Sequence, residues 1–292
     1  MSRIIVIAGL TATGKTDASI YLAKKYNAVI LNADSTQVYI EPLIATAKIK
    51  ENEKDGIEHY MFDIVSLDNE YTLFDYQKDA RKLLDKFIKE NRNVIIVGGS
   101  GLYLKALLYD YNLEETKTKR VDYSKYSNTE LKSIADNINP NNNIHENNRQ
   151  RLERYITYYN ETGKFIENKK EINNRIYDFD LIGLYASKDE LYDRINKRVD
   201  KMFDEGLLLE AKNLYSKHYK KYSSIIGYKE LELYFKGDIS LDEAKELIKK
   251  NTRHYAKRQM TWFKNQMTDI TWFKVNYNNF NETLEEIKNF LD

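Results

Sequence analysis

The sequence contains no cysteine, and only two prolines and four histidines occur among its 292 residues. Without cysteine there can be no disulfide, no thiolate metal site and no cysteine nucleophile, and four scattered histidines argue against a zinc site. Long hydrophobic runs are also missing. The first run, Ile4–Ala8, is too short for the hydrophobic region of a signal peptide, and no later run approaches the length of a membrane span. We therefore expect a soluble protein of the cytoplasm.

The sequence also has no large excess of positive or negative charge. The chain has 46 Lys and Arg against 45 Asp and Glu, which leaves a formal net charge of +1. A polyanionic partner would therefore have to bind local basic patches, because the protein as a whole produces no attractive field. The length suits one large domain or two modest ones, and we start from one apolar core with an appendage.

Short β-branched runs alternate with helical patterns in the first third of the chain. The runs are Arg3–Ala8, Ala28–Asp34 and Asn93–Gly99. This alternation predicts an α/β fold with a parallel sheet covered by helices. Ligands of such sheets bind beyond the carboxyl ends of the strands. The following loops should therefore converge on one crevice: Gly9–Thr16, Asp34–Tyr39 and Gly98–Tyr103.

From about Glu114 the chain becomes polar and rich in asparagine, with one helix-like piece near Thr129–Ala135. A strand-like run, Phe179–Ser187, then precedes a long helical stretch, and the remainder reads as helical. We predict a core domain formed by residues 1–115 and 180–292, with a small, mostly helical insertion domain at residues 116–179.

The stretch "GLTATGKT", Gly9–Thr16, lies between the first predicted strand and a helix. This setting is typical of a phosphate-binding loop, in which backbone N–H groups and the helix N-terminus face an anion while Lys15 adds positive charge. The Thr16 hydroxyl is the group that binds Mg²⁺ in such loops. The loop by itself leaves open whether the ligand is a nucleotide or another diphosphate.

Asp34 and the "VGGSG" stretch (Val97–Gly101) end the second and third predicted strands. Asp34 could cap a following helix or act as a general base. A phosphate-loop hydrolase would also have a strand that ends in an Asp to hold Mg²⁺ and orient water, but the third predicted strand ends in "VGGSG" instead. The glycines of the second stretch could allow backbone to approach a ligand, with Ser100 offering a hydroxyl, or could simply form a tight turn.

Basic residues gather in three runs of the second half of the chain, within "RQRLER", "KHYKKYSSIIGYK" and "KKNTRHYAKRQMTWFK". On a helix, Arg253, Lys257 and Lys264 form one basic stripe while Tyr255 and Trp262 point away from it. Such runs are often only solvated faces, but three of them in a nearly neutral chain favour a phosphate-backbone partner.

Taken together, these stretches resemble the tRNA dimethylallyltransferases, also called tRNA isopentenyltransferases, of the bacterial type. Eight motifs match in order over most of the chain: "GLTATGKT", "LNADSTQVY", "TAK", "DNEYTLFDYQKDA", "IIVGGSGLYLKALL", "NNRQRLERYITYYNETGK", "IIGYKEL" and "AKRQMTWFKN". The resemblance implies a phosphate-loop NTPase-like fold, Mg²⁺ as cofactor, and transfer of a dimethylallyl group from dimethylallyl diphosphate to N6 of the adenosine just 3′ of the tRNA anticodon. It also implies a monomer whose insertion domain contacts the anticodon arm.

The resemblance further implies roles for individual residues. Asp34 would be the general base, with Ser100, Lys15, Thr16 and Arg198 completing the catalytic set and Thr16 near the metal. The diphosphate would lie on Gly9, Leu10, Thr11, Ala12, Thr13, Gly14, Lys15 and Thr16. Contacts with tRNA are implied for Asp34, Ser35, Thr36, Gln37, Gln150, Arg151, Leu152, Glu153, Arg154, Ile226, Gly227, Tyr228, Lys229, Arg253, Lys257, Arg258, Gln259 and Lys264, with Gln37 reading the target base.

Two other functions share part of this pattern. A nucleoside or nucleotide kinase would also have the phosphate-binding loop and could use Asp34 as base toward a hydroxyl, but it would give the basic C-terminal helix no role. A tRNA-binding protein without catalysis would have no need for the combination of Lys15, Thr16, Asp34 and Ser100.

Overall fold

The computed structural model describes residues 2–111, 113, 121–166 and 174–292. The chain divides into two compact units. The core unit comprises Met1–Tyr111 and Asn174–Asp292, and the insertion unit comprises Asn112–Asn173. Each unit has its own hydrophobic cluster.

A six-stranded sheet forms the centre of the core unit, and every neighbouring pair of its strands is parallel. The strands are β1 (Ile4–Gly9), β2 (Ala28–Asn32), β3 (His59–Tyr60), β4 (Asn93–Val97), β5 (Asp180–Tyr185) and β6 (Thr271–Lys274). Their order across the sheet is β3-β2-β4-β1-β5-β6. The predicted parallel α/β fold is therefore confirmed, although the sequence patterns did not predict β3 and β6.

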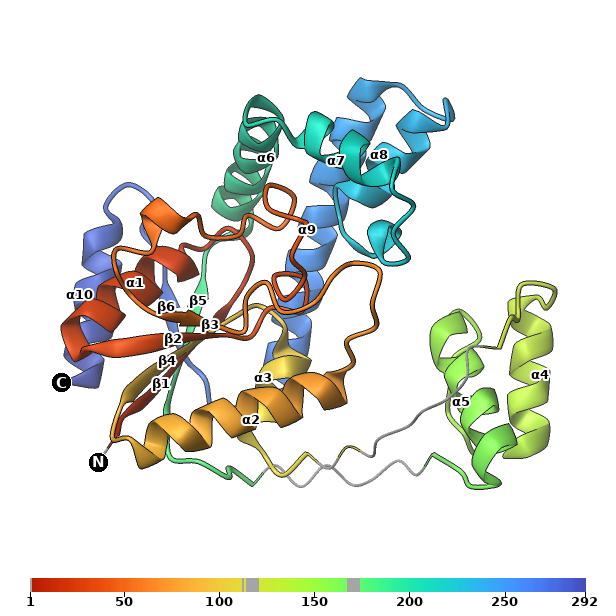
Figure 1. The fold of residues 1–292 in the computed structure, drawn as a ribbon, viewed down its shortest axis with the longest axis horizontal. Helices are drawn as coiled ribbons and strands as arrows, with labels where there is room; N and C mark the ends of the chain where they lie inside the picture. Colours follow the sequence, from red (N-terminus) through yellow and green to blue (C-terminus); the bar gives the residue numbers. More distant parts are fainter. Residues whose placement is uncertain (1, 112, 114–120, 167–173) are drawn as a thin grey trace. The chain divides into compact units, whose positions relative to one another are not determined.

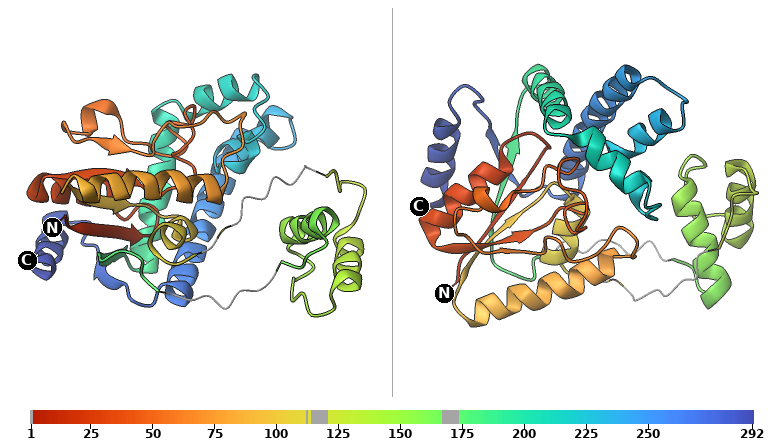
Figure 2. Two further views of the ribbon diagram at one scale, coloured as in Figure 1. Left: turned by 60° about the horizontal axis from the view of Figure 1, so that its bottom comes forward. Right: turned by 45° about the horizontal axis from the view of Figure 1, so that its top comes forward.

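Helices cover both faces of this sheet (Figures 1 and 2). Side chains of β1 alternate between the two faces: Ile5 and Ile7 join the cluster beneath α1 and α10, while Ile4 and Val6 join the cluster on the other face. The helices concerned are α1 (Lys15–Tyr26) and α10 (Phe280–Leu291) on one side, and α2 (Leu73–Lys89), α3 (Gly101–Leu108) and the end of α9 (Leu241–Gln266) on the other.

A second group of helices packs on the long loops that follow β2. It contains α6 (Lys188–Asp204), α7 (Leu207–Tyr215), the 3₁₀ turn η2 (Tyr222–Ser224), α8 (Tyr228–Phe235) and the first half of α9; a further 3₁₀ turn, η1, spans Glu51–Glu53. The predicted helical stretch beginning at Lys188 is two helices, because Gly206 adopts a φ of 104° that ends α6. Within the described residues, no helix combines the length and apolar composition needed to cross a membrane.

The insertion unit is built around α4 (Asn128–Ile138) and α5 (Arg149–Thr162). Ser127 caps α4 in a capping box with Glu130, as "SNTE" favours. Leu131 and Ala135 of α4 pack against Leu152 and Ile156 of α5, and all four side chains are buried. The unit is therefore mostly helical over its described part, as predicted.

The boundary of the insertion unit differs from the prediction of residues 116–179. Residues 112–115 fall in the insertion unit, whereas residues 174–179 lie with the core unit. Arg175 forms an ion pair of 2.6 Å with Asp269, its guanidinium lies over the Phe179 ring, and Phe179 is buried in the main cluster. A polar composition does not reveal the contact of Arg175 with Asp269, which is almost a hundred positions away.

Candidate functional site

A cleft of about 1270 Å³ opens at the carboxyl edge of the sheet, and we call it the loop cavity. Its lining includes residues of all three loops that were predicted to converge. They are Thr11–Thr16 after β1, Asp34 and Gln37 after β2, and Gly98 and Gly99 after β4, joined by Arg194 and Arg198 of α6 and Tyr255 and Gln259 of α9. The parallel topology brings these residues together, because it sends every strand end to the same edge.

The phosphate-binding loop is held in a strained backbone conformation. Ala12 has a φ of 64° and Gly14 a φ of 81°, and the Thr13 hydroxyl donates to the Leu10 carbonyl over 2.8 Å. No side chain caps the start of α1, which follows Gly14 directly. The first N–H groups of α1 are therefore available to an anion in the loop cavity.

Gly9 and Leu10 do not line the loop cavity, which corrects their prediction as diphosphate contacts. Gly9 belongs to β1, and a side chain there would place Cβ 2.5 Å from the Leu184 carbonyl oxygen of β5. Leu10 is 3% exposed and packs against Ile195 of α6. Both residues form the base of the loop, while Thr11–Thr16 form the wall of the cavity.

Two cations, Lys15 and Arg198, face one carboxylate, Asp34. The pKa of Lys15 is lowered to about 8, mainly by burial; the charge of Asp34 opposes this shift, and the charge of Arg198 adds to it. Burial likewise lowers the pKa of Arg198, again against Asp34. Within the described residues neither cation forms an ion pair closer than 4.0 Å. The pocket thus holds an excess of buried positive charge, which an anionic ligand would neutralise.

The Asp34 side chain caps a turn. It does not cap a helix, which was one of its predicted roles. Its Oδ1 accepts hydrogen bonds from the backbone N–H of Thr36 (2.9 Å) and from the Thr36 hydroxyl (2.7 Å). Asn32 supports it by accepting from the Asp34 backbone N–H over 2.9 Å. In the part of the chain that the structure describes, the second carboxylate oxygen has no hydrogen-bond partner. One oxygen therefore fixes the turn, and the other is available for chemistry.

Ser100 follows Gly98 and Gly99 of the loop cavity but does not itself line either cavity, and its place at the breaking bond stays a prediction. Its hydroxyl accepts from the Ser35 backbone N–H over 2.9 Å and donates to the Ser35 hydroxyl over 3.1 Å. Ser100 therefore ties the end of β4 to the turn that Asp34 caps. Ser100 also interacts with the Tyr255 hydroxyl, so its effect on a ligand would pass through Ser35 or Tyr255.

A second cavity of about 330 Å³ adjoins the first, and we call it the apolar cavity. Its hydrophobic lining comes from α6, α7, α9 and the segment around η2: Ile195, Val199, Met202, Leu207, Ile225, Ile226 and Ile248. The two cavities share six lining residues, which are Thr11, Asp34, Thr46, Arg198, Met202 and Tyr255. Asp34 therefore stands where the cationic loop cavity meets a cavity whose lining combines these hydrophobic side chains with Arg198, Arg258 and several hydroxyl groups.

Tyr255 was predicted only as an aromatic residue turned away from the basic stripe. It does turn away from that stripe, but it lines both cavities instead of serving as a core anchor. Burial raises its pKa above the ordinary range, and the charge of Asp34 raises it further. The phenol is therefore a neutral hydrogen-bonding group at the junction. A single tyrosine among 24 gave no sequence signal for this position.

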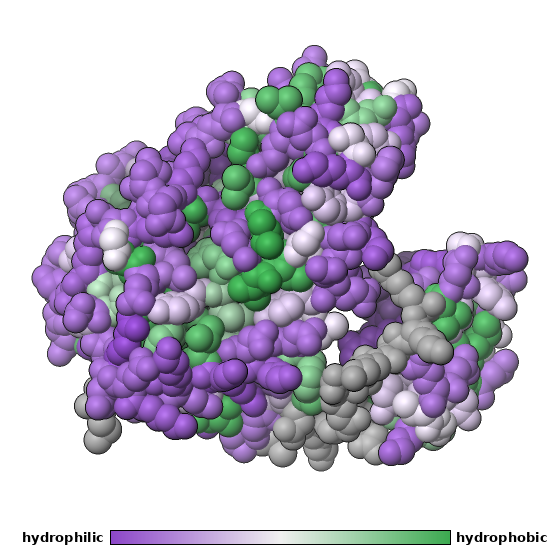
Figure 3. Space-filling model, viewed as in Figure 1, coloured by the Kyte–Doolittle hydropathy of each residue, from purple (hydrophilic) through white to green (hydrophobic). Residues whose placement is uncertain are grey.

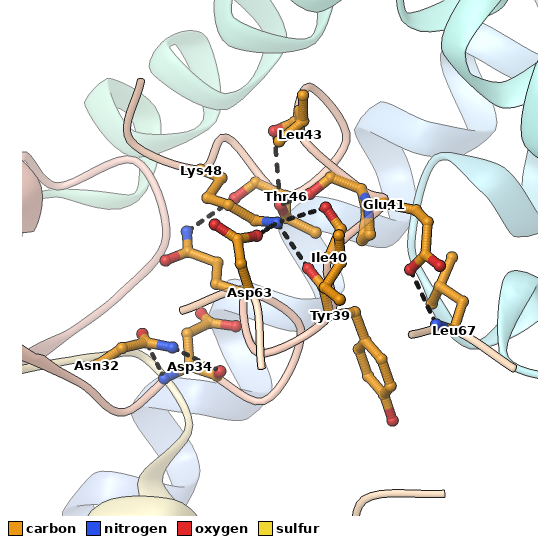
Figure 4. A network of polar contacts seen from close by, with 12 residues as sticks. Asn32, Asp34, Tyr39, Ile40, Glu41, Leu43, Thr46, Lys48, Asp63 and Leu67 are labelled. Atoms are coloured by element: carbon orange, nitrogen blue, oxygen red, sulfur yellow. Dashed lines mark hydrogen bonds and ion pairs between the residues drawn. The ribbon is translucent and has the colours of Figure 1, made fainter. Parts of the chain in front are cut away.

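Lys48 organises the loop that carries Gln37 (Figure 4). The side chain is 2% exposed, and its ammonium donates to the carbonyls of Tyr39 (2.6 Å) and Ile40 (3.2 Å) and to the Asp63 carboxylate. Burial lowers the pKa of Lys48, while Asp63 opposes that shift. Gln37 is fixed by a 3.0 Å hydrogen bond from its Nε2 to the Thr46 carbonyl. The "TAK" motif thus supplies a buried structural cation beside the predicted base reader.

Hydrophobic side chains gather in the middle of the face drawn in Figure 3, over the loops that follow β2. Ile40 and Ile64, which are 48% and 41% exposed, lie on adjoining segments, because the Ile40 N–H donates to Val65 and the Ile64 N–H donates to Val38. Leu43 is 54% exposed in the same loop. This surface offers apolar contacts next to the cavities.

The glycines of "VGGSG" lie so close to other parts of the protein that no side chain would fit at their positions. A Cβ at Gly98 would lie 2.1 Å from the Ala33 carbonyl oxygen, and one at Gly99 would lie 2.3 Å from Nε2 of Gln259. At Gly101 it would lie 2.1 Å from the Trp262 ring. Gly98 and Gly99 also line the loop cavity. The close approach that these glycines permit is chiefly to β2 and α9.

Of the α9 residues that were predicted to contact tRNA, some have exposed side chains and others have side chains bonded to other parts of the protein. Lys257, Arg258 and Lys264 are exposed, and Arg258 also lines the apolar cavity. Arg253 is not part of that free surface, because its guanidinium donates to Asn196 over 2.6 Å and lies over a tyrosine of α6. Gln259 is only 6% exposed, with both ends of its amide bonded to backbone. The prediction that Gln259 contacts tRNA is therefore wrong for its side chain.

The other predicted tRNA segments contain buried members as well. Tyr228 is 0% exposed, with its hydroxyl donating to Glu210, and Gly227 is buried, whereas Ile226 lines the apolar cavity and Lys229 is exposed. In the insertion unit, Gln150, Arg151 and Arg154 are exposed. Leu152 is in the core of that unit, and Glu153 forms an ion pair of 2.7 Å with Arg149. The side chains of Leu152 and Tyr228 are thus corrected from tRNA contacts to core residues.

The described residues contain no cluster of three or more His, Asp or Glu side chains that could hold a metal ion. The Thr16 hydroxyl is exposed at the start of α1 and lines the loop cavity. Such a position fits a metal ion that takes most of its ligands from phosphate oxygens and water. It does not fit a metal held by the protein alone.

Comparison with known proteins places this site in a family. Residues 37–266 match the family described as IPP transferase. The chain is 44% identical to the tRNA dimethylallyltransferase of Fusobacterium nucleatum, over 94% of this chain and 92% of that one. It is 41% identical to the tRNA dimethylallyltransferase of Enterococcus faecalis, over 93% and 92% of the two chains.

Two solved structures are similar over nearly the whole chain. One is the full-length tRNA isopentenylpyrophosphate transferase of Bacillus halodurans, with 35% identity, a TM-score of 0.75 and coverage of 100% of this chain and 96% of that one. The other is a eukaryotic dimethylallyltransferase acting on tRNA, with 26% identity, a TM-score of 0.80 and coverage of 99% and 78%. By sequence and by structure, this chain belongs to the IPP transferase family.

Proposed function

We propose that this protein transfers a dimethylallyl group from dimethylallyl diphosphate to N6 of the adenosine immediately 3′ of the anticodon in tRNA. The observation that carries the proposal is the place of Asp34, where the loop cavity meets the apolar cavity. A prenyl diphosphate has one anionic end and one apolar end, and these match the two cavities. The names of the similar proteins support the same reaction.

The diphosphate would lie in the loop cavity against the N–H groups at the start of α1, with Lys15 and Arg198 as its cationic contacts. Both cations have their pKa values lowered in the unliganded site, and an incoming anion relieves this cost of burying positive charge. As the C–O bond breaks, negative charge grows on the pyrophosphate. Donors and cations already held in place stabilise this charge without reorganising.

Asp34 would accept the proton that the adenosine N6 amine loses as the new C–N bond forms. The amine is a weak nucleophile because its lone pair is delocalised into the ring, so a carboxylate within reach of that proton assists the attack. The carboxylate oxygen without a hydrogen-bond partner is the one suited to this role. A base inside a stacked anticodon loop cannot reach it, so the adenosine must leave its stack and enter the loop cavity, whose lining includes both Asp34 and Gln37.

Gln37, which lines the loop cavity, would recognise the adenine there. Its Nε2 is already bonded to Thr46, which leaves its carbonyl oxygen to accept from the amine. Thr16 would hold a Mg²⁺ ion together with the diphosphate oxygens; when bound, the ion neutralises part of the charge on the leaving group. Both assignments use side chains that line the loop cavity.

The tRNA backbone would bind the exposed cations, which are Lys229, Lys257, Arg258 and Lys264 in the core unit and Arg151 and Arg154 in the insertion unit. We propose that the anticodon arm contacts both units. We also propose that the protein acts as a monomer. Its place of work would be the cytoplasm, where its tRNA substrate is found.

The test offers the protein unmodified tRNA, labelled dimethylallyl diphosphate and Mg²⁺, and looks for label in the nucleic acid. A parallel reaction offers ATP with nucleosides and nucleotides. The proposal expects label in tRNA and no phosphorylated product. Turnover of ATP with an inert prenyl diphosphate would favour the kinase interpretation, and tight tRNA binding without transfer would favour the non-catalytic one.

A further inference from the structure

The side-chain amide of Gln259 joins the phosphate-binding loop to the end of β4. Its Oε1 accepts from the Thr11 backbone N–H over 2.9 Å, and its Nε2 donates to the Gly99 carbonyl over 2.9 Å. The side chain is 6% exposed, so water cannot replace these partners readily. One buried carboxamide therefore satisfies two backbone groups on neighbouring loops of the site.

Both backbone groups need an outside partner because they lie just beyond the sheet. The preceding residue of the loop, Leu10, still donates to the Leu184 carbonyl of β5, so Thr11 is the first residue without a sheet partner. Gly99 has the same position beyond β4. A Cβ at Gly99 would lie 2.3 Å from Nε2 of Gln259, so a glycine at this position is what allows the amide to approach.

Gln259 is carried by the helix that also carries the exposed tRNA residues. Lys257 and Arg258 immediately precede it on α9 and are exposed, whereas Tyr255, one turn earlier on the same face, lines both cavities. A carboxamide can accept on one side and donate on the other, which a carboxylate or an amine cannot do. The residue type therefore fits the two partners.

We propose that Gln259 is a positioning residue of the reaction: it holds the Thr11 end of the phosphate-binding loop and the Gly99 turn in register, and so sets the diphosphate site from helix α9. The proposal deepens the proposed function and rests on it for the identity of the diphosphate. It assigns Gln259 to the diphosphate side of the site and gives its side chain no contact with tRNA.

The decisive variant is Gln259→Glu, which has nearly the same shape. When its carboxyl is protonated, the O–H donates to Gly99 and the other oxygen accepts from Thr11, so the wild-type pattern is kept. When it is ionised, two acceptors face each other at Gly99. Burial and that carbonyl should raise the pKa of the introduced carboxyl, while Lys15 and Arg198 across the cavity should lower it. Arg258 is exposed, and Asp34 opposes ionisation. Tyr255 stays neutral, and its hydroxyl interacts with the side chain at position 259, so it can donate to the ionised carboxyl and lower its pKa.

The readouts are the affinity for inorganic pyrophosphate by calorimetry, the KM for dimethylallyl diphosphate and the Kd for tRNA, each as a ratio to wild type between about pH 5.5 and 7.5. Lys15 has a pKa of about 8 in wild type, above this range of pH. We expect Gln259→Glu to lose roughly 10- to 100-fold in diphosphate affinity at the upper pH, the usual cost of an unsatisfied buried group, and to recover most of it at the lower pH. Its tRNA affinity should equal that of wild type throughout.

Two further variants keep the test informative. Gln259→Met has a similar volume and neither hydrogen bond, so its loss should be the same at every pH. Gln266→Glu is the matched control on the same helix, because Gln266 accepts from Lys105 over 3.1 Å and a carboxylate does so equally well. The control should keep its diphosphate affinity at every pH.

Three results would overturn the proposal. A loss of tRNA affinity with unchanged pyrophosphate affinity would make Gln259 a tRNA contact. A lower melting temperature with wild-type KM and Kd values would reduce it to a packing role. A loss in Gln259→Glu that does not vary with pH would show that the donor to Gly99 is irrelevant. If instead wild type binds pyrophosphate but uses no prenyl diphosphate, the proposed function fails while the role of Gln259 can still be measured.

Discussion

Replacing Asp34 by asparagine separates its two roles, because each carboxylate oxygen serves one of them. The oxygen that accepts from the Thr36 N–H and hydroxyl has an equivalent in asparagine, so the turn should survive. The oxygen without a partner becomes an NH₂ group, which cannot accept a proton. We therefore expect Asp34→Asn to fold normally, with a stability change of at most about 1 kcal/mol.

The catalytic loss should be far larger than the change in stability. Removing a general base costs roughly 10²- to 10⁴-fold in rate, or about 3–5 kcal/mol of transition-state stabilisation. A second loss comes from Lys15, because the charge of Asp34 partly offsets the lowering of its pKa. Without Asp34 the pKa of Lys15 should fall below about 8, so at neutral pH and above less of the cation remains to hold the diphosphate.

Single-turnover transfer with saturating tRNA and dimethylallyl diphosphate measures the first effect, at about pH 6.5, where Lys15 stays protonated in both proteins. Repeating the affinity measurement near pH 8 exposes the second effect. Asp17→Asn is the control, because it removes another carboxylate of the loop cavity that makes no contact with Thr36. A loss below about 10-fold at the lower pH would refute the base assignment and leave the departing pyrophosphate as the proton acceptor.

Three further predictions test other parts of the site. Removing the charges of Lys257 and Lys264 should weaken tRNA binding and reduce the salt slope by about 0.7–0.9 for each lost phosphate contact; an unchanged slope would place the tRNA on another face. The affinity of wild type for pyrophosphate should fall as the pH rises through about 8, because Lys15 then loses its charge, and calorimetry between about pH 7 and 9 should show a flatter profile for Lys15→Arg, whose charge persists. A flat wild-type profile would contradict that role. Gly101→Ala should destabilise the protein by about 1–3 kcal/mol in thermal unfolding, because the new Cβ would lie 2.1 Å from the Trp262 ring; an unchanged melting temperature would show that the ring moves aside freely.

The parts of the fold that could be predicted from sequence are those with strong local patterns. The β-branched runs of β1, β2 and β4 and their loops were recognisable because buried parallel strands are almost continuously apolar. The two edge strands were not recognisable: β3 has only two residues, and β6 has four, the outer two of which are exposed. Such short segments contain too few residues for any periodicity to show.

The sequence predicted which types of residue occur in the site, but not which hydrogen-bond partners their side chains have. Arg253 has the right charge and spacing for a basic stripe, yet Asn196 of α6 takes its guanidinium. Gln259 occurs in a stretch that resembles a tRNA-binding motif, yet its amide is buried against two loops far away in sequence. A local sequence pattern could not predict Asn196 or Thr11 as hydrogen-bond partners, because both contacts depend on the packing of α9 against other elements.

The order of strands in the sheet also constrains how the chain can fold as it is synthesised. β1 lies between β4 and β5, and its N-terminal neighbour Arg3 pairs with Asp180, which is 177 residues later. When β1, β2, β3 and β4 have emerged from the ribosome, four parallel strands can assemble, but one side of β1 stays open until the whole insertion unit and then β5 have followed. During that interval the nascent chain presents an unpaired, wholly apolar strand edge, the kind of surface that chaperones cover and that aggregates when it is left uncovered.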